Sequence, residues 1–285
     1  MSSKTNSSNS KNRFVAPEHW SAQLLQENSI FADLNRHYPL ASCSDWPSLA
    51  SLNQWLRHSP VQLVQNEVLE QDGRYYEAYI HATGQVPTRS DNWHDLFGAC
   101  IWGLFPQTKA LLNQLHMTEI AEHGLKQRSK LRNKVTLFDE CGVLICLEPE
   151  AKQHANLLRA HQWQQSFVTK RSDWWQSIKP VIFGHAIYEM ATKPFLGLTA
   201  KCLFIGVPTG FCHWSLTDAY SFLDQKMSQQ IANGGLLLDN EQLTPLPLLG
   251  VPGWWEDNLQ TGFYLNTEYF RPLRAKNQAT IRKLT

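Results

Sequence analysis

The stretch Val86–Leu112, VPTRSDNWHDLFGACIWGLFPQTKALL, contains a strongly amphipathic helical pattern. From Trp93 to Leu104, apolar side chains recur at intervals of three and four residues, which places them on one face of a helix. Pro87 favours an extended chain before this pattern, and the Asn92 side chain is suited to cap the first turn. We therefore expect a helix here whose apolar face joins a hydrophobic core.

Several polar and small residues of this helix lie away from its apolar face. His94 falls at the edge of that face, and Asp95 falls nearly opposite, where a carboxylate favours the positive end of the helix. Gly98 and Gly103 each lower helix propensity by about 1 kcal/mol relative to Ala. Their presence predicts that backbone or a ligand approaches the helix closely at these positions.

Two segments of the chain have the pattern of β-hairpins. Residues 61–69 and 74–81 alternate like strands around a turn at 70–73, and residues 135–139 and 143–147 do so around a turn at 140–142. In the second strand, Glu77 would share a face with two tyrosines, either on a wet sheet surface or in a pocket. Further strands are expected at 180–183 and 199–207.

Helical spacing predicts helices over 18–34, 46–56, 107–123, 150–167, 185–192 and 215–233. We expect a single α+β domain over residues 14–272, with an antiparallel, hairpin-built sheet packed with several helices. A disordered polar tail is expected at 1–13 and a basic C-terminal tail at 273–285.

Composition restricts the class of protein. The chain has 285 residues, of which 42% are hydrophobic, enough for a sizeable core. Residues 1–12 lack the apolar segment of a secretory signal, and no run of 18 apolar residues occurs, so we expect a cytoplasmic protein without a membrane partner. The six cysteines form no C-x-x-C pair, which predicts reduced thiols rather than disulfides or a zinc ribbon.

Basic residues gather in two places. Residues 1–17 and 271–285 carry eight Lys and Arg and no acid, although the whole chain has a net charge of only +1, and 126–134 has a base at every second position. These segments could contact a phosphate backbone. Because the rest of the chain is acidic, we do not expect nucleic acid to be the main partner.

Seven polar residues are candidates for chemistry, in order of how poorly a structural role alone explains them: His94, His185, Glu189, Asp139, Glu140, Glu77 and Asp95. His185 and Glu189 are four residues apart and share a helix face, and imidazole with carboxylate is a common pair of metal ligands. Combined with His94 and Asp139, they predict a site for a divalent metal or an acid-base pair, with Glu77 as a further catalytic candidate. A metal there would lower the pKa of bound water to about 7, which predicts a hydrolase.

Two other interpretations remain open. The same histidines and acids could be satisfied structural groups of a non-enzymatic binding protein, whose partner docks on Trp174, Trp175, Trp254 and Trp255. If a small anionic molecule is bound, Arg89, Lys109 and Lys201 are the candidates to bind it. Nucleotide-binding and serine-hydrolase motifs such as G-x-S-x-G and the Walker A loop do not occur.

Five ordered strings resemble an uncharacterised bacterial family, the domain of unknown function DUF3025. They are VPTRSDNWHDLFGACIWGLFPQTKALLN, KVTLFDECGVLI, FGHAIYE, GLTAKCL and PLPLLGVPGWWEDN. The resemblance extends from about Trp20 to Pro272 and supports one integral domain. It implies no activity, cofactor or catalytic residue.

Overall fold

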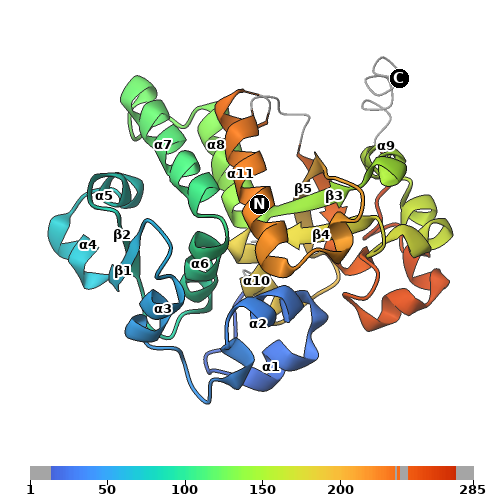
Figure 1. Ribbon diagram of the computed structural model, residues 1–285, viewed down its shortest axis with the longest axis horizontal. Coiled ribbons are helices and arrows are strands. Elements are labelled where there is room, and N and C mark those ends of the chain that lie inside the picture. The colour runs from blue at the N-terminus through green and yellow to red at the C-terminus, as the bar shows by residue number, and fades with distance from the viewer. Residues whose placement is uncertain (1–13, 235, 238–242, 274–285) are drawn as a thin grey trace, which may run out of the picture.

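The computed structural model describes residues 14–234, 236–237 and 243–273 (Figure 1). The expected tail at 1–13 lies outside the described residues, as does the expected C-terminal tail beyond Leu273. No helix of the described part combines the length and the apolar character needed to cross a bilayer. The helices are α1 (Ala22–Glu27), α2 (Ala32–His37), α3 (Leu49–Trp55), α4 (Glu67–Asp72), α5 (Tyr76–Thr83), α6 (Trp93–Leu104), α7 (Pro106–His123), α8 (Lys130–Cys141), α9 (Gln153–Arg159), α10 (His185–Ala191) and α11 (Leu216–Ala232).

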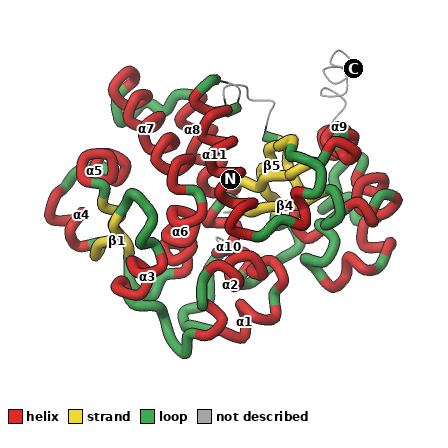
Figure 2. Tube along the Cα trace, in the orientation of Figure 1, coloured by secondary structure: helices red, strands yellow, loops and turns green. Residues whose placement is uncertain are grey.

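Within the described ranges, six strands form two sheets (Figure 2). The strands are β1 (Gln62–Gln65), β2 (Gln85–Thr88), β3 (Gly142–Leu147), β4 (Ile178–Ile182), β5 (Thr199–Gly206) and β6 (Thr244–Pro247). The larger sheet has the order β4-β3-β5-β6, with β3 parallel to β5 and antiparallel to β4. Every residue of β3 and β4 is buried, which explains why their sequences are nearly continuous apolar runs.

Helices separate the two sheets (Figure 1). The small parallel pair β1-β2 lies with α3, α4 and α5 at one end of the molecule, and α6, α7, α8, α10 and α11 lie between this group and the larger sheet. Helix α10 packs against α6 and α8, and α11 packs against α7. Phe31 stacks on Phe97 and Tyr188, so the N-terminal helices share the same core.

The helix expected after Asn92 is confirmed as α6. The Asn92 side chain accepts a hydrogen bond from the Asp95 backbone N–H and caps the helix. Both faces of α6 are largely buried, because the Tyr38 hydroxyl packs against Gly103 and donates to the Cys100 carbonyl. The close approach predicted at Gly103 is therefore a side chain from the N-terminal helices.

The first predicted hairpin is wrong. Residues 62–65 do form β1, but its partner is the parallel strand β2, and the expected second strand is the helix α5. Gly73, a residue of the expected turn, ends α4, and Gly84 ends α5, with positive φ angles of 75° and 67°. Tyr76, Tyr79 and Ile80 recur at the spacing of a helix, and the segment folds according to this pattern rather than to the alternation expected of a strand.

The second predicted hairpin is also wrong. Residues 135–139 belong to α8, which begins after the Ser129 cap and buries Val135 and Phe138 on one face. Only its second strand is confirmed, as β3. Asp139 consequently lies in the last turn of a helix rather than at a strand end.

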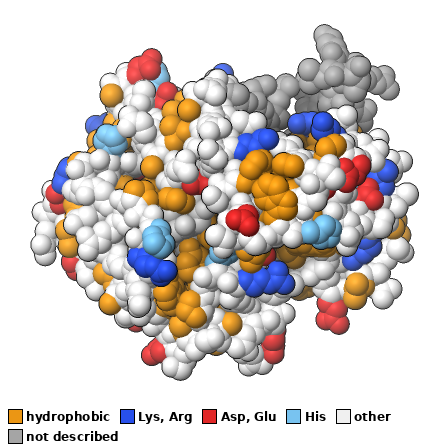
Figure 3. Space-filling model, in the orientation of Figure 1, with side chains coloured by type: hydrophobic (Ala, Val, Ile, Leu, Met, Phe, Trp, Pro, Cys, Tyr) orange, Lys and Arg blue, Asp and Glu red, His pale blue; other side chains and the backbone are white. Residues whose placement is uncertain are grey.

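The α+β class is confirmed, whereas the sheet is mixed rather than antiparallel and hairpin-built. The five bases of 126–134 do not share one side of an extended chain, because the segment enters α8 at Lys130 and buries Arg132 and Lys134. On the face shown in Figure 3, Lys and Arg side chains form separate small groups between hydrophobic ones. The described residues of this face therefore form no continuous basic stripe of the kind typical of nucleic-acid-binding proteins.

The start of α7 depends on a carboxylate from another helix. Asp224 of α11 is 2% exposed, and its oxygens accept hydrogen bonds from the backbone N–H groups of Gln107 and Thr108 at 3.0 and 2.8 Å. We expect Asp224→Ala to lower the free energy of unfolding by about 2 kcal/mol, because two backbone N–H groups at the start of α7 lose their acceptor, and that of Thr108 is buried. Urea unfolding measures this difference, with the exposed neighbour Gln225→Ala as the control. A loss no larger than that of the control would contradict the capping role.

Candidate metal centre

A cavity of about 550 Å³ opens among α5, α6, α7, α8 and α10. Six of the eight residues predicted to be functional line it: Glu77, Arg89, His94, Lys109, Asp139 and His185. Some of the residues that line the cavity are more than one hundred positions apart in the sequence. The site therefore depends on the backbone contacts that bring these segments together.

The junctions at the ends of α8 and β4 bring two site residues together. The backbone N–H groups of Phe183 and Gly184 both donate to the Gly142 carbonyl, at 2.9 and 2.8 Å. A Cβ atom on Gly184 would collide with the backbone of 140–142, so only glycine allows this approach. As a result Glu140, at the end of α8, lies beside His185, at the start of α10.

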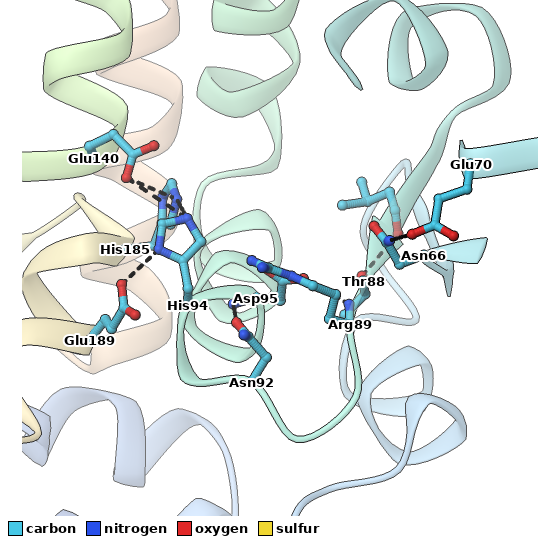
Figure 4. Close-up of polar contacts among 11 residues, drawn as sticks. Asn66, Glu70, Thr88, Arg89, Asn92, His94, Asp95, Glu140, His185 and Glu189 are labelled. Carbon is cyan, nitrogen blue, oxygen red and sulfur yellow. Dashed lines mark hydrogen bonds and ion pairs between the residues drawn. The ribbon is translucent and has the colours of Figure 1, made fainter. Parts of the chain in front are cut away.

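Three side chains converge at one point of the cavity (Figure 4). The Nε2 atoms of His94 and His185 are 3.0 Å apart, with their rings at 73° to each other. The nearest Glu140 oxygen lies 3.5 Å from His185 Nε2 and 3.9 Å from His94 Nε2. Two imidazole nitrogens and one carboxylate oxygen thus face one another.

Glu189 supports this cluster from behind. Its carboxylate lies 2.9 Å from the Nδ1 atom of His94, on the side of the ring that faces away from His185 (Figure 4). Since a carboxylate accepts, His94 Nδ1 carries the proton of this hydrogen bond. Glu189 therefore fixes the orientation of the ring and leaves His94 Nε2 directed at the cluster.

The electrostatics of the two histidines differ. Burial lowers the pKa of His185 to about 3, so its imidazole is neutral at pH 7. Burial also lowers the pKa of His94, but the hydrogen bond that His94 donates to Glu189 and the charge of Glu140 outweigh this effect. The pKa of His94 is therefore raised above the ordinary 6.5. Burial raises the pKa of Glu140. A proton on His94 Nε2 is therefore donated to the lone pair of neutral His185.

The other ring nitrogen of His185 is unusual. Nδ1 is buried and makes no acceptable hydrogen bond with any described residue, although the backbone of Asp139 lies close enough to favour a proton on the ring. His185 Nδ1 therefore makes no strong contact that would hinder the binding of a charged group at His185 Nε2.

Asp139 lies next to the cluster in an ion pair. Lys109 Nζ is 2.6 and 2.8 Å from its two oxygens and 5.3 Å from the centre of the Trp102 ring. Burial alone would raise the pKa of Asp139, but the Lys109 ammonium lowers it below the ordinary 3.8. Both oxygens of Asp139 thus already contact a cation.

The remaining predicted residues lie in three places. Glu77 is on α5 and lines the cavity, and its carboxylate accepts a hydrogen bond of 2.6 Å from Asn113. Arg89 lines the rim and pairs with both oxygens of Asp95, at 2.9 and 2.8 Å. Lys201, on β5, lines a separate hollow together with Arg271. The three cations predicted to bind an anion are therefore not gathered at one point.

Apart from Lys109, sequence reasoning missed the residues of the face that α7 presents to the cavity. Lys109, Leu112, Asn113 and His116 line it, at helical spacing along one stripe. All four are buried, and a buried polar stripe on an otherwise polar helix is the signal that identifies such a face.

Two other clusters among the described residues resemble chemical sites. His154 contacts Ser166 Oγ at 3.0 Å and Asp173 at 2.9 Å, in the order of a catalytic triad. However, Ser166 and His154 are fully buried, so a substrate has no access to the hydroxyl. Glu119, Glu122 and His123 also come together, but on the exposed end of α7.

The chain matches the family model described as a protein of unknown function, DUF3025, over residues 61–274. The chain belongs to the DUF3025 family. Every residue of the cluster and of its supporting shell lies inside the part matched to DUF3025, whereas α1, α2 and α3 precede it. Neither a search of curated proteins nor one of solved structures finds a match.

Proposed function

We propose that this DUF3025 protein is a hydrolase that binds a divalent metal ion, best suited to zinc, between His94, His185 and Glu140. The ligand atoms would be the Nε2 atoms of the two histidines and one carboxylate oxygen. Two imidazoles and one carboxylate form a common ligand set of catalytic zinc sites, in which the fourth position holds water.

The observation that carries this proposal is the spacing of the three atoms. They are separated by 3.0, 3.5 and 3.9 Å, and a point equidistant from all three lies about 2.0 Å from each. This is the length of a zinc bond to an imidazole nitrogen or a carboxylate oxygen. An ion can therefore be bound with almost no movement of the ligands.

The roles proposed here refine those predicted from the sequence. Glu189 acts as the carboxylate that orients a ligand histidine, because its oxygen faces His94 Nδ1. Asp139 acts as the counter-ion of Lys109. Glu140, in the last turn of α8, supplies the carboxylate ligand in place of these two.

The bound ion would lower the pKa of a coordinated water to about 7 and so supply a nucleophile at neutral pH. Lys109 lies in the same cavity, where it is held in its ion pair with Asp139. Trp102 and Leu112 add apolar walls that limit the access of bulk water.

The test combines metal analysis with a hydrolysis assay. Protein purified without chelator should contain one ion per chain, and chelator-treated protein should regain activity with Zn²⁺, Mn²⁺ or Co²⁺ on a panel of 4-nitrophenyl esters, nitroanilides and phosphodiesters. The Co²⁺ form should also give the visible absorption of a tetrahedral site. Chelator-resistant activity, or activity without any bound ion, would contradict the proposal.

Glu189 provides a more selective test. We expect Glu189→Gln to weaken metal binding by about 10- to 100-fold while leaving activity measurable at saturating metal, since it alters only the orientation of His94. Titration of the chelated protein with Zn²⁺ measures this, and Glu122→Gln, on the exposed end of α7, serves as the control. Equal affinity of Glu189→Gln and wild type would mean that Glu189 has no such role.

The rival interpretation, a binding protein that docks a partner on tryptophans, has less support. Trp174 and Trp254 are buried, at 3% and 6% exposed, and the Trp175 indole donates to the Pro252 carbonyl. Trp175 and Trp254 pack edge to face and connect the segment after α9 to the C-terminal segment, although Trp175 is 37% exposed.

A further inference from the structure

The cations that line the cavity are already neutralised. Arg89 and Lys109 are its basic side chains among the described residues, and each contacts both oxygens of an aspartate, Asp95 and Asp139 respectively. Glu70 and Glu77 line the cavity in addition to these aspartates. The part of the cavity beyond the metal ligands is therefore acidic, which opposes an anionic ligand.

Glu77 is a half-buried acid of this cavity whose carboxylate has no cationic partner among the described residues. Its carboxylate accepts one side-chain hydrogen bond, from Asn113 Nδ2, and forms no ion pair with any described residue. Burial is the main cause that raises the pKa of Glu77, and it outweighs the contact with Asn113. A buried carboxylate of this kind is stabilised when a cation is placed beside it.

A second, independent group in the same cavity lacks a partner. His116 is only 5% exposed, yet its Nδ1 atom makes no hydrogen bond with any described residue. Burial lowers the pKa of His116 to about 4, so the ring is neutral at pH 7 and can accept a hydrogen bond from an N–H group. A buried nitrogen without a partner is destabilising, and a ligand N–H group would supply the missing hydrogen bond.

These residues lie on adjacent faces of two helices. Asn113 and His116 are three residues apart on α7, and Asn113 connects α7 to Glu77 on α5 through both the carboxylate and the backbone carbonyl. The Trp102 ring forms another wall of the cavity. A carboxylate, a neutral imidazole and an aromatic ring are the groups that recognise an ammonium ion.

We propose that Glu77, Asn113 and His116 form a subsite for a protonated amine, so that the substrate is a small molecule carrying an ammonium group. The assignment of this amine to a substrate rests on the proposed function, with the hydrolysable bond at the His94–His185–Glu140 end. Binding of the amine itself requires no metal.

Calorimetric titration of chelator-treated, metal-free protein tests the subsite with three probes of equal length: pentylamine, 1-pentanol and pentanoate. Pentylamine should bind, while the alcohol and the acid should bind at least tenfold more weakly. Glu77→Gln keeps the acceptor for Asn113 and should weaken pentylamine binding by at least tenfold, and Glu122→Gln, on the exposed end of α7, should leave it unchanged.

Tighter binding of pentanoate than of pentylamine to the wild-type protein would overturn the proposal and does not depend on any variant. So would unchanged binding of pentylamine to Glu77→Gln. Protein that binds pentylamine but no metal would support the subsite and contradict the proposed function. Protein that binds metal but not pentylamine would contradict the subsite and support the metal centre of the proposed function.

Discussion

His94→Ala and His185→Ala should each lose the bound ion. Removal of one of three protein ligands leaves two, and we expect the affinity for Zn²⁺ to fall by at least about 100-fold, more than for any change behind the ligands. Glu140→Gln should have a similar effect, because an amide oxygen is a much weaker ligand than a carboxylate. Elemental analysis of the purified variants and titration of their chelated forms measure the loss.

His81→Ala is the matched control for these variants. His81 lies on α5 and is exposed, and it does not line the cavity. It should retain one ion per chain. If His94→Ala and His185→Ala retained the ion as His81→Ala does, the ligand assignment would be wrong, whatever activity the protein shows.

Asp139→Ala should be strongly destabilising, by about 3 kcal/mol, because it leaves the Lys109 ammonium buried without its counter-ion. The Lys109 side chain is 9% exposed and that of Asp139 is 19% exposed, so water screens the pair little. The double variant Lys109→Met/Asp139→Leu removes both charges and should regain most of this loss. Urea unfolding of the two variants at pH 7 makes the comparison.

The exposed pair Arg74–Asp72 provides the control, since Asp72→Ala breaks a contact at the surface and should change stability little. The pair with Lys109 also has a predictable pH dependence. Because the pKa of Asp139 is lower in the folded protein than its ordinary 3.8, its contribution is present at neutral pH and is lost as the pH falls below that value. A double variant as unstable as Asp139→Ala would contradict this account.

Helices with regular amphipathic spacing could be predicted from the sequence, whereas the choice between helix and strand in short segments could not. Helix α6 and strand β5 lie where spacing and apolar runs predict them. Segments 74–81 and 135–139 are short enough to fit both periods, and their helical form depends on burial against α7 and the sheet. The parallel pairing of β3 with β5 likewise depends on contacts between distant segments.

The candidate site likewise could be predicted from the sequence only in part. His94, His185 and Glu189 were singled out by residue type and spacing, and they form one hydrogen-bonded chain. Their convergence depends on the packing of α10 against α6, and the hydrogen bonds that join the end of α8 to the start of α10 add Glu140; no local pattern encodes either contact. The same geometry makes Glu140 rather than Asp139 face the imidazoles, because adjacent residues of a helix point in different directions.

The most direct test of the metal centre is the anomalous scattering of crystals of the zinc-loaded protein, measured on both sides of the zinc absorption edge. We predict one strong anomalous peak about 2.0 to 2.2 Å from His94 Nε2, His185 Nε2 and a Glu140 oxygen. An ordered His94–His185 hydrogen bond without a peak, or a peak only at another position in the protein, would contradict the central claim.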